Sequence, residues 1–149
     1  MAEPRELGPV LGFMHALWSV DHALRTASKR MGRKLGVTGP QRLVIRLVGR
    51  FPACTAGELA TLLSVDPSTL TGVLARLERR RLIERRADEH DRRRARFTLT
   101  ADGRTLDRER SGTVEAAVRR ALGRLGDGDI RVTRAVLEAL ASELTVGGP

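Results

Sequence analysis

The chain has 149 residues, with 27 lysines and arginines against 18 acidic residues, for a formal net charge of +9. This length suits one domain, or one domain with a dimerisation appendage, and is not expected to hold a second, catalytic domain. The basic balance favours a polyanion, with nucleic acid the leading candidate, whereas an aromatic content of only 3% argues against a base-stacking surface for single strands or RNA.

The first predicted element is a helix of about 28 residues, in which apolar residues recur at spacings of three and four. The pattern runs from Leu7 to Leu35, and Gly36 ends it. So long a helix cannot bury its whole length against so small a domain. We therefore expect part of it to pack against a partner subunit.

One stripe of this helix combines polar and aromatic side chains. His15, Trp18 and His22 follow one another at spacings of three and four. Either the stripe lines a pocket for a small effector, or Trp18 is ordinary interface core with the histidines as its neighbours. A metal site is not expected, because the two histidines lie two turns apart with only Asp21 nearby.

Two capping boxes predict the starts of the next two helices. Thr38 precedes Gln41, and Thr55 precedes Glu58, at the spacing that lets the two side chains of each pair bond each other's backbone. Phe51-Pro52 closes the first of these helices, and the second is barely two turns long. The residues predicted to point inward from the two helices are Leu43, Val44, Leu47, Val48, Leu59, Ala60, Leu62 and Leu63.

The next helix is predicted from Pro67 to about Arg80, with Asp66 as its cap. Its apolar face consists of Leu70, Val73, Leu74 and Leu77. Its first turns are rich in small hydroxyl residues, which would let the helix enter a major groove closely, although such residues are often only caps.

Two short strands are predicted after this helix, over residues 82–86 and 95–99, with Ile83, Phe97 and Leu99 inward. The loop between them is too long for a tight turn, and its cationic tip could enter a narrow minor groove. Alternatively, the acidic residues of the loop neutralise the arginines in a solvated charge run. The positions of the arginines favour a functional role over a solvated charge run, since 13 arginines and only 8 acidic residues fall between Arg76 and Arg110.

The remainder of the chain reads as two helices. One helical pattern runs from Leu106 to Leu125, where Gly126-Asp127-Gly128 interrupts it, and a last helix runs from Ile130 to Leu144. The two are expected to form an antiparallel hairpin suited to a dimer interface.

The segment from Asp66 to Gly103 resembles the MarR family of bacterial transcriptional regulators. It reads DPSTLTGVLARLERRRLIERRADEHDRRRARFTLTADG. Among winged helices, the motif Asp91-Arg92-Arg93 followed by Leu99-Thr100 and Gly103 is specific to that family. One departure is Arg81, where such sequences commonly have a glycine in the left-handed conformation. The departure affects local geometry and not the DNA-facing positions.

The resemblance implies a fold that is mainly α with a small β wing. A winged helix-turn-helix lobe would span residues 37–100, between an N-terminal dimerisation helix (1–36) and C-terminal dimerisation helices (101–149), all in one integrated domain. It implies a homodimer that binds a pseudo-palindromic operator in double-stranded DNA as a repressor, with recognition helices ~34 Å apart. Family members are often released from DNA by small, frequently phenolic anions, for which the stripe around Trp18 would be the pocket.

The resemblance also implies roles for individual residues. Those expected at the major groove or its bordering phosphates are Ser68, Thr69, Thr71 and Arg76. Arg92 and Arg93 would serve the wing tip, with Arg93 favoured for the minor groove and Asp91 bracing an arginine from the side. The remaining arginines of the wing, either phosphate contacts or surface charges, are Arg86, Arg94 and Arg96.

Cysteine content and hydropathy point to the cytoplasm. The single cysteine, Cys54, excludes an internal disulfide, and it lies outside the first helix, where some MarR-like proteins carry a reactive cysteine, so we expect it to be inert. The first ten residues do not resemble a signal peptide, and no apolar run approaches the ~20 residues of a membrane span. A soluble protein without a membrane partner is expected.

Two other classes of function compete with DNA-binding regulation. An enzyme is not expected, and neither is a cofactor, because the three histidines and one cysteine form no catalytic constellation and there is no glycine-rich phosphate loop. A winged-helix adaptor that binds only proteins is the more serious alternative. An adaptor, however, has no reason to concentrate arginine in the recognition helix and wing.

Overall fold

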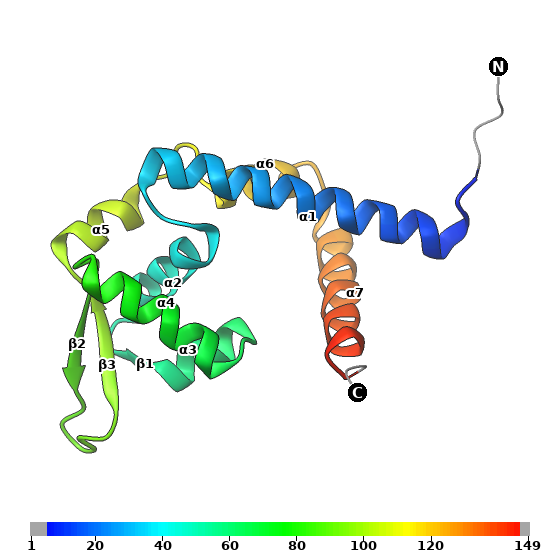
Figure 1. Cartoon of the computed structure of the whole chain (residues 1–149). Coiled ribbons are helices and arrows are strands. Elements are labelled where there is room, and N and C mark those ends of the chain that lie inside the picture. The colour runs from blue at the N-terminus through cyan, green and yellow to red at the C-terminus, as the bar shows by residue number, and fades with distance from the viewer. Residues whose placement is uncertain (1–5, 147–149) are drawn as a thin grey trace. The chain divides into compact units, whose positions relative to one another are not determined.

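A computed structural model describes residues 6–146 of the chain (Figure 1). It is mainly helical with one small antiparallel sheet, which confirms the predicted fold class. The chain divides into two compact units, one ending at Val114 and the other beginning at Glu115. Within residues 6–146, no helix has the length and apolar character needed to cross a membrane.

The first unit holds eight elements in the described part of the chain. They are α1 (Gly8–Leu35), α2 (Gly39–Arg50), β1 (Cys54–Thr55), α3 (Ala56–Leu63), α4 (Pro67–Arg79), β2 (Ile83–Ala87), β3 (Ala95–Leu99) and α5 (Ala101–Arg108). The predicted length of α1 is confirmed at 28 residues. Both capping boxes are also confirmed, since Thr38 and Gln41, and likewise Thr55 and Glu58, bond each other's backbone N–H groups.

The core lies between α2, α3, α4 and the sheet, where Ile45, Leu59 and Leu77 are completely buried. Two predicted inward residues are wrong: Leu43 and Leu62 are each about half exposed, at 50% and 52%. In α2 the buried stripe consists of Gln41, Val44, Ile45 and Val48, at helical spacing, so Leu43 falls outside it. In α3 the inner face is filled by Leu59, Ala60 and Leu63, and Leu62 points elsewhere.

The sheet contains a strand that the sequence did not predict. Its order is β1-β3-β2, with Cys54 of β1 opposite Phe97 of β3. A strand of two residues is too short to show an alternating pattern. Cys54 is free and buried, and burial raises the pKa of its thiol, which supports the expectation that it is inert.

The turn after α4 is held against α5 by short backbone contacts. Thr100 donates its N–H to the carbonyl of Leu82 (3.1 Å) and its hydroxyl to the carbonyl of Arg81 (2.7 Å). Gly103 has no room for a side chain, because a β carbon there would lie 2.0 Å from the Leu82 carbonyl oxygen. Arg81 itself adopts the left-handed conformation, with φ of 55°, in which glycine is least strained.

A buried arginine joins α2 to the end of α5. The guanidinium of Arg42, 2% exposed, donates to the carbonyls of Leu106 and, at 2.6 Å, of Glu109. Next to it, Arg46 pairs with Asp107 at 2.6 Å. The carbonyl of Leu106 also accepts the N–H of Glu109, the residue that caps α5, so the arginines add side-chain donors to carbonyls at the end of this helix. Sequence periodicity carried no sign of this link.

The second unit contains α6 (Val114–Leu122) and α7 (Asp127–Val146). Two predictions about the C-terminal segment are wrong. The helical pattern that begins at Leu106 is not one helix, because α5 ends at Arg108 and Gly112 turns the chain with φ of 71°. The last two helices do not form an antiparallel hairpin: neither buries a residue, and Figure 1 shows α7 leading away from the end of α6 without running back beside it.

Candidate nucleic-acid interface

The fourth helix is docked by one face and open on the other. Asp66 caps it by accepting the N–H of Ser68 at 2.7 Å, and its bonds with the hydroxyl and N–H of Ser68 lower the pKa of Asp66. Leu70, Leu74 and Leu77 are buried against the core, as predicted. The helix is therefore fixed in place by its buried face, while the side chains of its opposite face remain exposed to solvent.

The three hydroxyl residues of this face differ in what they can still bond. The Ser68 hydroxyl donates to Asp66, and the Thr71 hydroxyl donates to the carbonyl of Pro67 at 2.8 Å. Thr69 is exposed, and within residues 6–146 its hydroxyl bonds nothing. A phosphate oxygen only accepts hydrogen bonds, so the hydroxyl of Thr69 can donate to phosphate directly. The hydroxyls of Ser68 and Thr71 would first have to break the bonds that they donate within the chain.

The centre of the exposed face carries no side chain. Gly72 lies between Thr69 and Arg76 at helical spacing, and a β carbon on Gly72 would meet nothing within 4 Å. Arg76 is exposed on the same stripe. Because Gly72 has no side chain, the floor of a DNA groove could come close to the helix backbone at this position. The longer side chain of Arg76 could reach farther along the same stripe.

Asp88 closes the loop of the wing, residues 83–99, where that loop leaves β2. One carboxylate oxygen of Asp88 accepts the N–H of His90 at 2.7 Å, and the other accepts Nε of Arg96 at 2.6 Å. These bonds, first the His90 amide and then the Arg96 guanidinium, lower the pKa of Asp88, whose side chain is only 5% exposed. Arg96 also donates to the carbonyl of Ala53 at 2.8 Å. Arg96 is therefore a structural residue and not the free phosphate contact considered from the sequence.

The tip of the wing presents arginines beside one aspartate. Asp91 accepts the N–H of Arg93 at 3.0 Å, and its carboxylate lies 3.5 Å from Nε of Arg93 and 3.9 Å from Nε of Arg94. The Arg93 side chain is 95% exposed, and Arg92 is exposed as well. Asp91 thus contacts two arginines from the side and leaves their donors available to solvent.

The strand register separates two neighbouring arginines of β2. Arg85 lies opposite Phe97, and Arg86 lies opposite Arg96. Side chains alternate along a strand, so Arg85 shares the face that packs against α4, and Arg86 lies on the other face, where it pairs with Glu84 at 3.2 Å. Arg86 therefore lies on the face of β2 away from α4, although it borders the same hollow as Glu78 near the end of that helix. Arg85 was missed from the sequence, although alternation from the buried Ile83 places it on the α4 side.

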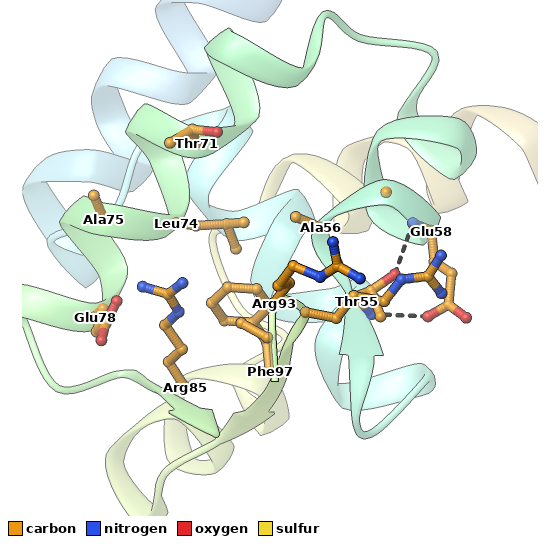
Figure 2. A pocket seen from close by; sticks show the side chains of 13 residues that line it. Thr55, Ala56, Glu58, Thr71, Leu74, Ala75, Glu78, Arg85, Arg93 and Phe97 are labelled. Atoms are coloured by element: carbon orange, nitrogen blue, oxygen red, sulfur yellow. Dashed lines mark hydrogen bonds between the residues drawn. The ribbon is translucent and has the colours of Figure 1, made fainter. Parts of the chain in front are cut away.

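A groove of about 590 Å³ runs between α4, the start of α3 and the wing. Its apolar base includes Leu74 and Phe97, and Figure 2 shows Arg85 extending from β2 toward Glu78 while Arg93 lies beside Thr55 and Ala56. The rest of its lining is Gly57, Glu58, Thr71, Ala75, Arg94 and Ala95. The α4 helix and the arginines Arg93 and Arg94 of the wing therefore border one continuous surface.

The three candidate effector residues lie on α1. His15, Trp18 and His22 are exposed and line a shallow hollow of about 570 Å³, together with Leu7, Leu11, Met14 and Ser19. All of these residues belong to α1 or the residue before it, so one chain provides only one wall. Among residues 6–146, no three potential metal ligands of the His, Cys, Asp and Glu types are grouped.

Comparisons with known proteins agree on one family. A family model described as MarR family matches residues 35–94. An HTH-type transcriptional repressor of Mycobacterium tuberculosis is 33% identical over 133 residues, which cover 89% of this chain and 94% of the repressor. The organic hydroperoxide resistance transcriptional regulator of Bacillus subtilis is 37% identical over 73 residues, about half of each chain.

Two solved structures with similar folds are complexes with DNA. The MepR–DNA complex of S. aureus has a TM-score of 0.73 and 20% identity, covering 89% of this chain and 97% of MepR. The complex of Streptococcus pneumoniae FabT with DNA has a TM-score of 0.69 and 25% identity, covering 92% of this chain and 98% of FabT. The likeness to MepR concerns the fold alone.

Proposed function

This chain belongs to the MarR family of winged helix-turn-helix transcriptional regulators, and we propose that it is a repressor that binds a pseudo-palindromic DNA operator as a homodimer. Regulators of this kind are not enzymes. The proposal rests chiefly on the surface formed by α4 and the wing. There, small side chains on a firmly docked helix lie beside exposed arginines, a combination suited to a groove and its phosphates.

Each residue of this surface has a proposed role. Thr69 donates to a backbone phosphate, and Arg76 reaches a base edge or a bordering phosphate in the major groove. Arg92 and Arg93 enter or flank the minor groove, where negative potential attracts guanidinium groups. Four residues have weaker claims. The hydroxyl protons of Ser68 and Thr71 are already bonded within the chain. Arg86 lies on the face of β2 away from α4, and Arg94 is less exposed than Arg93, at 70% against 95%.

The homodimer is proposed from apolar side chains that a single chain leaves exposed. On α1, Val10 and Trp18 are 70% and 60% exposed, and on α7, Val132 and Leu144 are 65% and 70% exposed. Contiguous exposed apolar side chains on helices mark surfaces that another protein covers. A dimer through these helices would carry two recognition helices about one DNA turn apart, ~34 Å.

Release by a small anionic effector, such as a phenolic acid, is the second element of the proposal. The hollow on α1 offers the aromatic face of Trp18 and the ring nitrogens of His15 and His22, which are groups that hold an aromatic ring and a carboxylate. A second wall would have to come from elsewhere in the dimer.

The decisive experiment selects duplex fragments with the purified full chain and then measures binding at a series of salt concentrations. We expect retention of a pseudo-palindromic sequence and a logarithmic affinity that falls linearly with the logarithm of salt concentration. Absence of retention on duplex DNA at low salt would contradict the proposal and favour an adaptor. Repeating the assay with phenolic acids then tests the effector separately, since an unaffected affinity would remove that element alone.

A further inference from the structure

The end of the recognition helix is bonded to the end of the first helix. Arg80 is the residue that ends α4, and its guanidinium donates to the carbonyl of Gly36. Gly36 ends α1 in the left-handed conformation, with φ of 70°. The fit is close, since a β carbon on Gly36 would lie 3.0 Å from Nη2 of Arg80. A guanidinium is favoured at this place because the end of a helix presents carbonyls with partial negative charge.

The first helix is attached to the DNA-binding lobe only near its C-terminal end. Met31 is its one buried residue in the described chain, and the hydroxyl of Ser28 accepts the N–H of Gly39 at 2.7 Å. The exposed apolar residues of α1 lie farther toward Gly8. Contacts at one end of α1 therefore set the direction of the whole helix relative to the lobe.

The direction of α1 matters for DNA binding because a small rotation at one end of a long helix produces a large displacement at the other end. A helix of 28 residues is about 42 Å long. A rotation of about 5° at one end of such a helix moves the other end by roughly 4 Å, close to the ~3.4 Å rise of one base pair. If α1 lies in the dimer interface, its angle to α4 determines the distance between the two recognition helices.

We propose that Arg80 is a positioning residue that holds α1 and α4 at a defined angle and so selects the half-site spacing that the dimer accepts. The inference rests on the proposed function, because spacing has meaning only for a DNA-binding homodimer. Arg80 acts through the backbone of Gly36 and does not itself touch DNA. Within the described residues, its neighbour Arg79 bonds only the carbonyl of Ala75 on its own helix, at 3.4 Å, and so provides a matched control.

The test uses three operator duplexes, with the selected spacing and with one base pair added or removed between half-sites. Wild type should prefer the selected spacing. Arg80→Met keeps the aliphatic stem but removes the donors. The ratio of affinities for the selected and the altered operators should then fall by roughly threefold to tenfold, the effect of losing one solvent-exposed hydrogen bond. The salt dependence on the selected operator should be unchanged. Arg79→Met should leave the spacing preference as in wild type.

Three outcomes would overturn the inference. One is an R80M protein that melts and sediments like wild type and keeps the full spacing preference. Another is a salt slope reduced by about one per subunit with the preference intact, which would make Arg80 a phosphate contact. The third is Arg80→Lys, which keeps a positively charged donor group, behaving no differently from R80M in a folded dimer. Failure of the wild-type protein to bind any duplex would instead refute the proposed function.

Discussion

Arg96 and Asp88 fix the start of the wing loop, with Nε of Arg96 2.6 Å from a carboxylate oxygen of Asp88. The same arginine reaches the carbonyl of Ala53 just before β1, so one side chain joins three segments of the lobe. The arginines at the tip can stay exposed because the loop that carries them is held by bonds to Asp88, whose side chain is only 5% exposed. This division between structural and exposed arginines underlies the predictions that follow.

Replacing Asp88 with asparagine should destabilise the protein at neutral pH and much less in acid. The His90 amide and the Arg96 guanidinium lower the pKa of Asp88 in the folded state, so its carboxylate stabilises the fold above the unfolded value of ~3.9. That stabilisation is lost as pH falls through the lower folded pKa. Urea unfolding at pH 7 and pH 3 measures the difference, with Glu89→Gln on the same loop as control. An equal loss of stability at both pH values would contradict the assignment.

Replacing Arg93 with alanine should weaken operator binding without changing thermal stability. Its side chain is 95% exposed, and such surface changes usually alter stability by less than about 0.5 kcal/mol. Arg86→Ala removes the same charge from the face away from α4 and should weaken binding less. Fluorescence anisotropy and melting curves on both variants provide the comparison. Unchanged operator affinity in R93A would refute its role in the wing.

Replacing Thr69 with valine should lower operator affinity by roughly tenfold or more for each subunit, the cost of one hydrogen bond to a charged phosphate. Valine has nearly the same shape and helix propensity, so stability should be retained. Ser68→Ala, by contrast, disturbs the bond with Asp66 at the helix start and should show mainly as a lower melting temperature. If S68A lost more affinity than T69V, the hydroxyl assignments would have to be exchanged.

Replacing Gly72 with alanine should raise stability and lower operator affinity together. An added β carbon meets nothing within 4 Å, and alanine in a helix interior is more stable than glycine by roughly 0.5–1 kcal/mol. The added methyl group would, however, fill the space that a duplex groove needs beside α4. Denaturant unfolding and anisotropy report the two effects independently. A stabilised variant with full affinity would show that DNA does not approach the helix at this position.

Replacing Leu144 with glutamate should dissociate the dimer and abolish tight operator binding at the same time. The side chain is 70% exposed in the single chain, so the substitution should not unfold the subunit itself. Sedimentation velocity gives the oligomeric state, and circular dichroism confirms folding. A variant that sediments as a dimer would place the interface elsewhere.

Much of the secondary structure could be predicted because its signals are local. The Thr38–Gln41 and Thr55–Glu58 boxes each act within four residues, and both appear in the structure as predicted. The interruption of the helical pattern between α5 and α6 could not be predicted from local signals of this kind. It depends on Gly112 and on the carboxylate of Glu109, which accepts the N–H of Ser111 at 2.8 Å, and the apolar spacing continues past both.

By itself, the sequence indicated where the helices and the two wing strands of the lobe begin, which family the chain resembles, and that arginine is concentrated from residue 76 onward. It could not assign a task to each arginine, because all carry the same charge and the same donors. Only the tertiary structure decided that Arg96 pairs with a buried aspartate, that Arg80 reaches a helix end 44 residues away, and that Arg93 remains exposed. The physical reason is that caps and periodicity act over a few residues, whereas the partner of a long, flexible side chain depends on which distant backbone folding brings within its reach.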